Sequence, residues 1–132
     1  MAKASSLCMG IEEEAVRLKE LRDHIEKELL KINGALVNGD VRFRLPNTCN
    51  ISFLGVEASL VMEALSQEFA IATGSACNTE LSAPSYVLQA MGLSAERIQG
   101  SLRISVGRYN SLEEVDHLCT RLKAVIKKLK NY

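Results

Sequence analysis

The segment from residue 74 to residue 80, GSACNTE, places a cysteine among small and polar residues directly after the apolar stretch FAIAT. A thiol reacts as its thiolate, so a reactive cysteine needs a partner that takes its proton. Free cysteine is more often a small buried core residue, and spacing alone favours that interpretation. Gly74, Ser75 and Ala76 offer little bulk to bury a thiol, however, and the polar residues that follow favour a loop near water. Cys77 is therefore a candidate loop nucleophile, with core packing as the alternative.

Arg103 is the second candidate, because it lies on the polar side of an alternating segment. In SLRISV, residues 101–106, the apolar side chains Leu102, Ile104 and Val106 alternate with polar ones. This period of two predicts a strand that buries its apolar face and points Arg103 away from the core. The planar guanidinium suits a carboxylate or a phosphate. The alternative for such an arginine is a surface salt bridge.

The other residues that could do chemistry have weaker support. Both histidines, His24 and His117, fall within predicted helices and far from Cys77 in sequence, so a Cys-His hydrolase has no local support. Arg108, just after the strand of Arg103, has the same two interpretations as Arg103. The four cysteines include no CxxC pair and no cluster with histidine, so we expect no metal site. The remaining cysteines are expected in the core (Cys49 and Cys119) or near the N-terminus (Cys8).

Composition bounds the class of protein. The chain has 132 residues, 47% of them hydrophobic, which suits one compact domain. Sixteen basic and sixteen acidic side chains cancel, so nucleic-acid binding is not expected. The apolar runs fall short of the roughly 20 residues of a membrane helix, and MAKASSLCMG lacks the apolar region of a secretory signal. These features predict a cytoplasmic protein with no membrane association and with reduced thiols.

The predicted elements alternate between strands and helices. Apolar spacing predicts amphipathic helices, and Ser111 with Glu114 forms a capping box before the last one. Alternation in TCNISF predicts a strand with Cys49, Ile51 and Phe53 on its buried face. This order predicts an α+β two-layer domain, a small mainly antiparallel sheet with helices packed on one face. The expected elements before residue 74 are a helix over 11–32, a short extended piece over 35–37, a strand over 48–53, a helix over 57–68 and a short buried strand over 69–72. After it we expect a short helix that begins near Pro84, with Tyr86, Val87, Leu88 and Met91 on its apolar face, and a strand over 101–106. The last expected element is a helix from Ser111 onward with one apolar stripe of Leu112, Val115, Leu118, Leu122, Val125 and Leu129.

Several of these motifs occur together in one known family. ATGSACNTELSAPSYVLQAMG followed by SLRISVGRYNSLEEVD, with VNGD and PNTCNISF before them, resembles the C-terminal small domain of pyridoxal-phosphate-dependent cysteine desulfurases. These enzymes are of the NifS/IscS type, in the class V aminotransferase family. The combination of GSAC, SxVL and RxSxGR at this spacing is far more specific than a lone cysteine. The resemblance covers nearly the whole chain and implies the small-domain fold of fold-type I pyridoxal-phosphate enzymes.

The resemblance also implies roles for single residues. Such enzymes take sulfur from L-cysteine, leave L-alanine, and carry the sulfur as a persulfide for iron-sulfur cluster assembly or other sulfur transfer. By position, Cys77 is the nucleophile and persulfide carrier, and it could transiently ligate an iron-sulfur cluster. Arg103 matches the arginine that binds the substrate carboxylate. The small residues Gly74, Ser75 and Ala76 would let the loop move. The implied partners are L-cysteine and a scaffold or sulfur-acceptor protein, and the parent enzyme is expected to be a homodimer.

The family's cofactor site implies a limit on the isolated chain. The Schiff-base lysine and most of the pyridoxal phosphate ligands lie in a preceding large domain, which has no counterpart in these 132 residues. Residues 1–34 are expected to form an N-terminal helix that partly links to that absent large domain, and residues 35–132 to form the cysteine desulfurase C-terminal domain. Without the cofactor the chain alone should be inactive. The alternatives are a non-enzymatic persulfide carrier or interaction module, and a fragment that is inert outside its parent.

Overall fold

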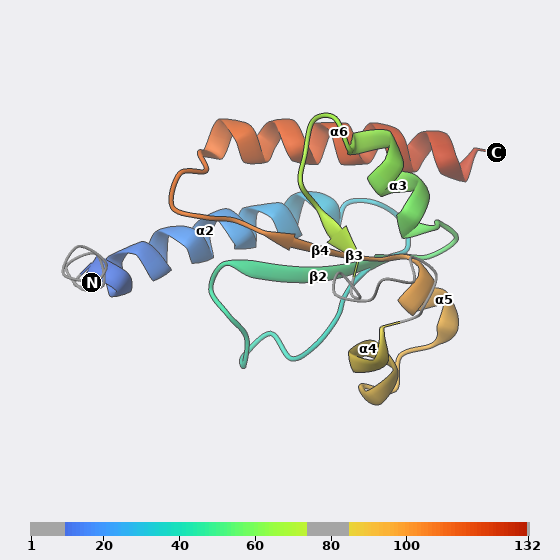
Figure 1. Ribbon diagram of the computed structural model, residues 1–132, viewed down its shortest axis with the longest axis horizontal. Coiled ribbons are helices and arrows are strands. Elements are labelled where there is room, and N and C mark those ends of the chain that lie inside the picture. The colour runs from blue at the N-terminus through green and yellow to red at the C-terminus, as the bar shows by residue number, and fades with distance from the viewer. Residues whose placement is uncertain (1–9, 74–84, 132) are drawn as a thin grey trace.

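The computed structural model describes residues 10–73 and 85–131, and in them a four-stranded sheet packs against helices (Figure 1). The strands lie in the order β1-β2-β4-β3, and every neighbouring pair is antiparallel. This arrangement confirms the predicted α+β fold. In chain order the elements are α2 (Ile11–Leu29), β1 (Ala35–Val37), β2 (Thr48–Phe53), α3 (Ala58–Leu65), β3 (Ala72–Thr73), α4 (Tyr86–Ala90), α5 (Ala95–Gln99), β4 (Ser101–Ser105) and α6 (Leu112–Lys130).

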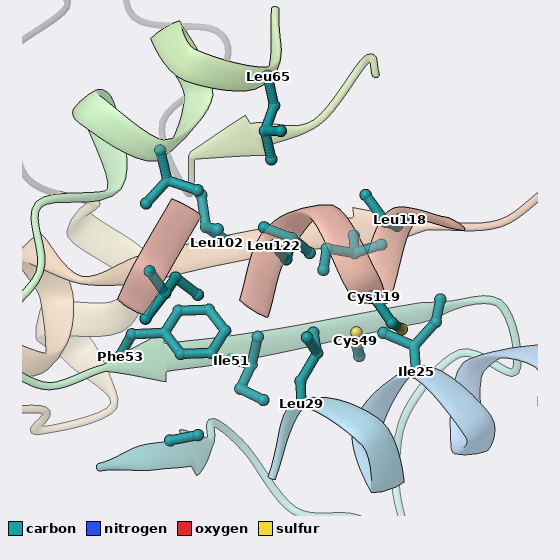
Figure 2. Close-up of a cluster of buried hydrophobic side chains, with 14 of the residues drawn as sticks. Ile25, Leu29, Cys49, Ile51, Phe53, Leu65, Leu102, Leu118, Cys119 and Leu122 are labelled. Atoms are coloured by element: carbon teal, nitrogen blue, oxygen red, sulfur yellow. The ribbon is translucent and has the colours of Figure 1, made fainter. Parts of the chain in front are cut away.

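The core lies between the sheet and the three helices α2, α3 and α6, which cover one face of it (Figures 1 and 2). Alternate residues of β2 point into this core, and Cys49, Ile51 and Phe53 are at most 1% exposed. Leu102 and Ile104 of β4 join them from the neighbouring strand. Full burial of one such side chain contributes about 1.5–3 kcal/mol. The period-two prediction for both strands is therefore confirmed, and it fixes which side chains face the other way.

Helix α6 begins at the predicted capping box. The Ser111 hydroxyl accepts a hydrogen bond from the Glu114 backbone N–H at 3.2 Å, and the Glu114 carboxylate accepts one from the Ser111 N–H at 3.0 Å. These bonds satisfy backbone donors that a helix start leaves unpaired. The predicted apolar stripe was wrong at its first position, because Leu112 is 52% exposed, and it omitted Ile126, which is fully buried. Its last position, Leu129, is partly buried and packs against the core. The stripe follows the contact with α2 and the sheet, which begins one turn after the helix does.

The strand predicted over residues 69–72 is shorter and begins later. Only Ala72 and Thr73 pair with β4, and Phe69 and Ile71 are half-buried. The chain between α3 and β3 instead leaves the edge of β4, and a groove opens between this segment and the first turns of α6. A run of four apolar residues thus predicts burial here but not the length of the pairing.

Two short helices lie beyond the opposite face of the sheet, at one end (Figure 1). The apolar face predicted for α4 is wrong, since Leu88 is buried whereas Tyr86, Val87 and Met91 are 46–77% exposed. Helix α5 is absent from the sequence-based expectations, although Ser94 accepts a hydrogen bond from the Arg97 N–H at 3.4 Å as its N-cap. Through Arg97 this helix covers part of the outward face of the sheet.

Candidate functional site

The face of the sheet that points away from the core is lined mainly by polar side chains. Register places Thr48 opposite Ser105, Asn50 opposite Arg103 and Ser52 opposite Ser101 along β2 and β4. The rows alternate with the apolar core residues, so these six side chains share one face. Outward-facing strand positions in the described residues are Leu36, Thr48, Asn50, Ser52, Ser101, Arg103 and Ser105, with no lysine among them.

Arg103 lies in the middle of this face, as its alternation predicted. It is exposed, and its cross-strand neighbours are Asn50 on β2 and Ala72 on β3. Within residues 10–73 and 85–131, its guanidinium makes no hydrogen bond and no carboxylate lies within 4 Å of it. The surface salt bridge that sequence reasoning kept as an alternative is therefore not observed among these residues. An exposed guanidinium without a protein anion can bind an external carboxylate or phosphate.

A buried hydrogen-bond network fills the row next to Arg103. The Asn38 side-chain NH2 group donates to Ser52 Oγ at 2.7 Å and also lies 3.0 Å from Ser101 Oγ, and all three residues are at most 7% exposed. Arg97 of α5 donates to Asn38 Oδ1 at 2.5 Å and to the Val37 carbonyl at 3.1 Å. Because buried polar groups are costly unless paired, this network holds β1, β2, β4 and α5 in one arrangement.

Sequence reasoning assigned no role to Asn38, Asn50 or Arg97. Asn38 belongs to the VNGD segment that contributed to the family resemblance, and Asn50 holds an outward position of a predicted strand. Those two signals were available in the sequence. The part played by Arg97 depends on contacts with residues about 60 positions away, which no local pattern records.

The proposed nucleophile Cys77, with Gly74, Ser75 and Ala76, lies outside the described residues. The structure does describe the chain on both sides of that segment. On one side, Ala72 and Thr73 pair with Arg103 and Leu102 of β4. On the other side, buried Ser85 caps α4 by accepting a hydrogen bond from the Leu88 N–H at 3.4 Å. The segment that contains Cys77 therefore starts directly after β3, the strand that pairs with β4 beside Arg103.

The other candidates have structural partners. His24 bonds to Asp116 at 2.6 Å, and His117 lies 3.5 Å from Glu68, so both histidines join elements that face the core side. Arg108 bonds through its Nε to Glu14 of α2 at 2.6 Å, as its salt-bridge alternative predicted. The loop after β4 is thus tied to α2, and each of these three printed contacts joins two parts of the chain.

The two described free cysteines are core residues, as expected. Cys49 and Cys119 are 1% and 2% exposed. Burial raises the pKa of the Cys49 thiol to about 12 and that of the Cys119 thiol to about 11, because the charged thiolate is poorly solvated there. Neither thiol is a nucleophile at neutral pH.

The part of the chain that the structure describes contains neither a metal-binding cluster nor a membrane-spanning helix. No group of three or more histidine, cysteine or acidic side chains is arranged to hold a metal ion there. No helix in residues 10–73 and 85–131 is both long enough and apolar enough to cross a bilayer.

Comparison with known proteins places this geometry in a family. Residues 1–118 match the aminotransferase class-V family. Proteins described as cysteine desulfurase IscS are 40% identical over 98% of this chain in Actinobacillus succinogenes and 42% identical over 89% in Histophilus somni. These matches cover 32% and 29% of the two relatives, so the chain spans about a third of their length.

Solved structures agree on the fold. A protein described as NifS-like superposes with a TM-score of 0.79 at 27% identity, over 92% of this chain and 30% of its own. A second, the NifS-like protein of Rickettsia africae, has a TM-score of 0.77 over 89% of this chain and 30% of its own, at 23% identity. The strand order, the helices on one face and the match over residues 1–118 together show that the chain belongs to the aminotransferase class-V family.

Proposed function

We propose that this chain is the C-terminal domain of a cysteine desulfurase and that it contributes Arg103 and Cys77 to the active site. The observation that carries the proposal is the position of Arg103, exposed on the polar face with no carboxylate partner among the described residues. Its neighbour on β3, Ala72, precedes Cys77 by five residues. Five residues of chain span at most about 18 Å, so the backbone of Cys77 is tethered to the strand beside Arg103.

The chemistry assigned to this chain has two parts. Arg103 binds the carboxylate of L-cysteine through a charge-assisted pair, which holds the substrate sulfur within reach of the loop. The Cys77 thiolate then attacks that sulfur, forming the S–S bond of a persulfide as the substrate carbon–sulfur bond breaks. The electron pair of the broken bond goes to carbon, which takes up a proton and leaves as L-alanine. Gly74, Ser75 and Ala76 give the loop the freedom to carry the sulfur away.

Pyridoxal phosphate in the complete enzyme supplies the electron sink that weakens the carbon–sulfur bond. The outward face described above carries an arginine and neutral polar groups but no lysine, which fits contact with a substrate carboxylate and not covalent attachment of the cofactor. We therefore assign cofactor attachment to a large domain outside this chain. Residues 1–34 would partly link to that domain and residues 35–132 would form the desulfurase domain, which is inactive alone.

The remaining assignments follow from the same proposal. The acceptor of the sulfur is an iron-sulfur scaffold or another sulfur-acceptor protein in the cytoplasm, and the complete enzyme is a homodimer. Cys77 could also ligate an iron-sulfur cluster transiently during transfer.

A chimera tests the function directly. This chain replaces the matching third of the Actinobacillus succinogenes relative, and the product is assayed with pyridoxal phosphate and L-cysteine for L-alanine and for a 32-dalton gain on the peptide of Cys77, the approximate mass of one sulfur atom. We expect turnover that Cys77→Ser abolishes and that Arg103→Ala lowers at subsaturating substrate, because the carboxylate loses its charged partner. Unchanged turnover in Cys77→Ser would refute the proposal. If a separate sulfur donor loads the unsubstituted chain and its Arg103→Ala variant equally well, the chain is a sulfur carrier instead.

A further inference from the structure

The donor and acceptor roles in the hydrogen-bond network next to Arg103 are fixed by the guanidinium of Arg97. A guanidinium can only donate, so the atom of Asn38 that lies 2.5 Å from Arg97 must be the oxygen of its carboxamide. The other end of that carboxamide is then its NH2 group, which donates to Asn50 Oδ1 at 2.7 Å. The orientation of both asparagines thus follows from chemistry, although oxygen and nitrogen of such groups look alike.

This order of bonds determines what Asn50 presents to its surroundings. Its oxygen is engaged with Asn38, so its NH2 group lies on the side of the carboxamide away from Asn38. Within the described residues this NH2 group has no hydrogen-bond acceptor. Asn50 is half-buried and lies directly opposite Arg103, where paired Cβ atoms are about 4.5–5.5 Å apart.

Asn50 and Arg103 therefore present two donor groups from paired strand positions, and within residues 10–73 and 85–131 neither group has an acceptor. The row on one side, Ser52 and Ser101, is internally bonded at 2.9 Å, and on the other side the Thr48 and Ser105 hydroxyls bond to each other at 3.0 Å. Arg97 Nε in the neighbouring network also has no hydrogen-bond partner among the described residues, but it is buried, so the donors of Asn50 and Arg103 are the ones offered to an external ligand in this row. A carboxylate has two oxygens and about four acceptor sites, so it can satisfy both groups at once.

We propose that the Asn50 amide is a second donor to the substrate carboxylate, alongside Arg103, and that Arg97 and Asn38 are positioning residues that keep its NH2 group turned outward. The proposal rests on the function assigned to Arg103 above and adds the residue that completes its carboxylate site. The proposal also gives the network next to the site a role. Without the Arg97 guanidinium, the carboxamides of Asn38 and Asn50 could both rotate by 180° and exchange their donor and acceptor ends.

The test uses the chimeric enzyme and compares L-cysteine with cysteamine, which has the same thiol and amine but no carboxylate. Asn50→Asp keeps the acceptor for Asn38 and replaces the donor by an anion. Asn50→Ala removes the donor without adding charge. We expect the KM for L-cysteine to rise at least about tenfold in both variants, with a smaller change in kcat, because a hydrogen bond to a charged group is lost. The inhibition constant of cysteamine should change less than twofold.

Controls separate this proposal from the function on which it rests. Asn33→Asp makes the same chemical change at an exposed site after α2 and should leave both constants unchanged. If Arg103→Lys raises the KM for L-cysteine but the Asn50 variants do not, the role of Asn50 is refuted while the function stands. If Arg103→Lys also leaves the KM for L-cysteine unchanged relative to the inhibition constant of cysteamine, the proposed function itself is refuted. Should Asn50→Asp not fold, as judged by circular dichroism, Asn50→Ala decides alone.

Discussion

The substitution Gly100→Ala tests whether the approach of β4 to the chain after β2 is as close as the structure requires. Gly100 lies between α5 and β4, where a Cβ atom would meet the Phe53 carbonyl oxygen at 2.3 Å and the Val56 carbonyl oxygen at 3.0 Å. Both obstacles are backbone atoms, so no change of side-chain rotamer relieves the clash. Glycine is required by this contact and not by its dihedral angle, because φ is −88°.

The cost can be worked out from two contributions. Forcing an extra carbon into a packed region costs about 1–3 kcal/mol. Moving the strand to make room weakens the hydrogen bond from the Phe53 N–H to the Gly100 carbonyl, now 3.0 Å, whose net value is about 0.5–1.5 kcal/mol. Alanine recovers some stability by restricting the unfolded chain, about 0.4–1 kcal/mol. The expected net loss in the free energy of unfolding is therefore about 2 kcal/mol, within a range of about 0.5–4 kcal/mol.

Urea unfolding of the 132-residue chain, followed by circular dichroism, measures that loss. Gly107 provides the matched control, since it lies just beyond the other end of β4 and a Cβ there would meet its nearest neighbour, Asn110, at 3.8 Å. Gly107→Ala should change the free energy of unfolding by less than about 1 kcal/mol. Equal stability of the Gly100→Ala and Gly107→Ala variants would refute the close approach of the two strands.

Three further results are expected. Ser111→Ala should lower the free energy of unfolding by about 1 kcal/mol, measured in urea, because the helix loses its N-cap; a loss no larger than that of an exposed mid-helix serine or threonine would contradict this. Hydrogen bonds from Lys123 and from Lys31, which lies just after α2, lower the pKa of Glu28 from 4.5 to about 2. Their stabilisation is present above pH 4.5 and is lost as the pH falls toward 2, so Glu28→Gln should flatten the dependence of Tm on pH in that range, and an unchanged slope would count against the pair. Finally, iodoacetamide at pH 8 should spare Cys49 and Cys119 until urea unfolds the chain, as followed by peptide mass spectrometry, whereas labelling in the folded state would contradict their burial.

Local patterns predicted those elements whose two faces differ in polarity. In β2, alternation distinguished Cys49, Ile51 and Phe53 from their neighbours, and all three face the core. The same pattern in β4 placed Arg103 on the outside. What alternation could not predict is that Ser52, on the outward face, is fully buried, because its cover comes from Asn38 and α5.

Helix α2 shows the same limit for charged residues. Its apolar spacing predicted a stripe from Ile11 onward, yet Ile11 is 62% exposed while Arg22 and Glu26 are 4% and 7% exposed. Arg22 donates to the Leu45 carbonyl at 2.9 Å, and Glu26 accepts from Arg44 at 2.8 Å. Charged side chains become buried here because the loop after β1 folds back onto the helix, a contact that a helical pattern does not encode.

The candidate site was predictable to the extent that it depends on single residues. Residue type and motif led to the proposal of Cys77 and Arg103, whereas the link between β3 and the strand of Arg103 came from strand order. β3 pairs with β4 so that Ala72 lies opposite Arg103, although the two residues are far apart in sequence. Such pairing depends on the whole sheet and leaves no local signal.

Under the proposed function, the two faces of the sheet have different roles. Helices α2, α3 and α6 bury the apolar face, which supplies the hydrophobic core of the domain. On that outward face, Asn38 and Arg97 satisfy the buried hydroxyls of Ser52 and Ser101, which leaves the donors of Asn50 and Arg103 for a ligand. Under the proposed function, the core face of β2 and β4 supplies the apolar burial and the row of Asn50 and Arg103 on the outward face binds the ligand. Substitutions of Asn50 or Arg103 should therefore change substrate binding with little loss of stability, whereas substitutions of their core-facing neighbours should do the reverse.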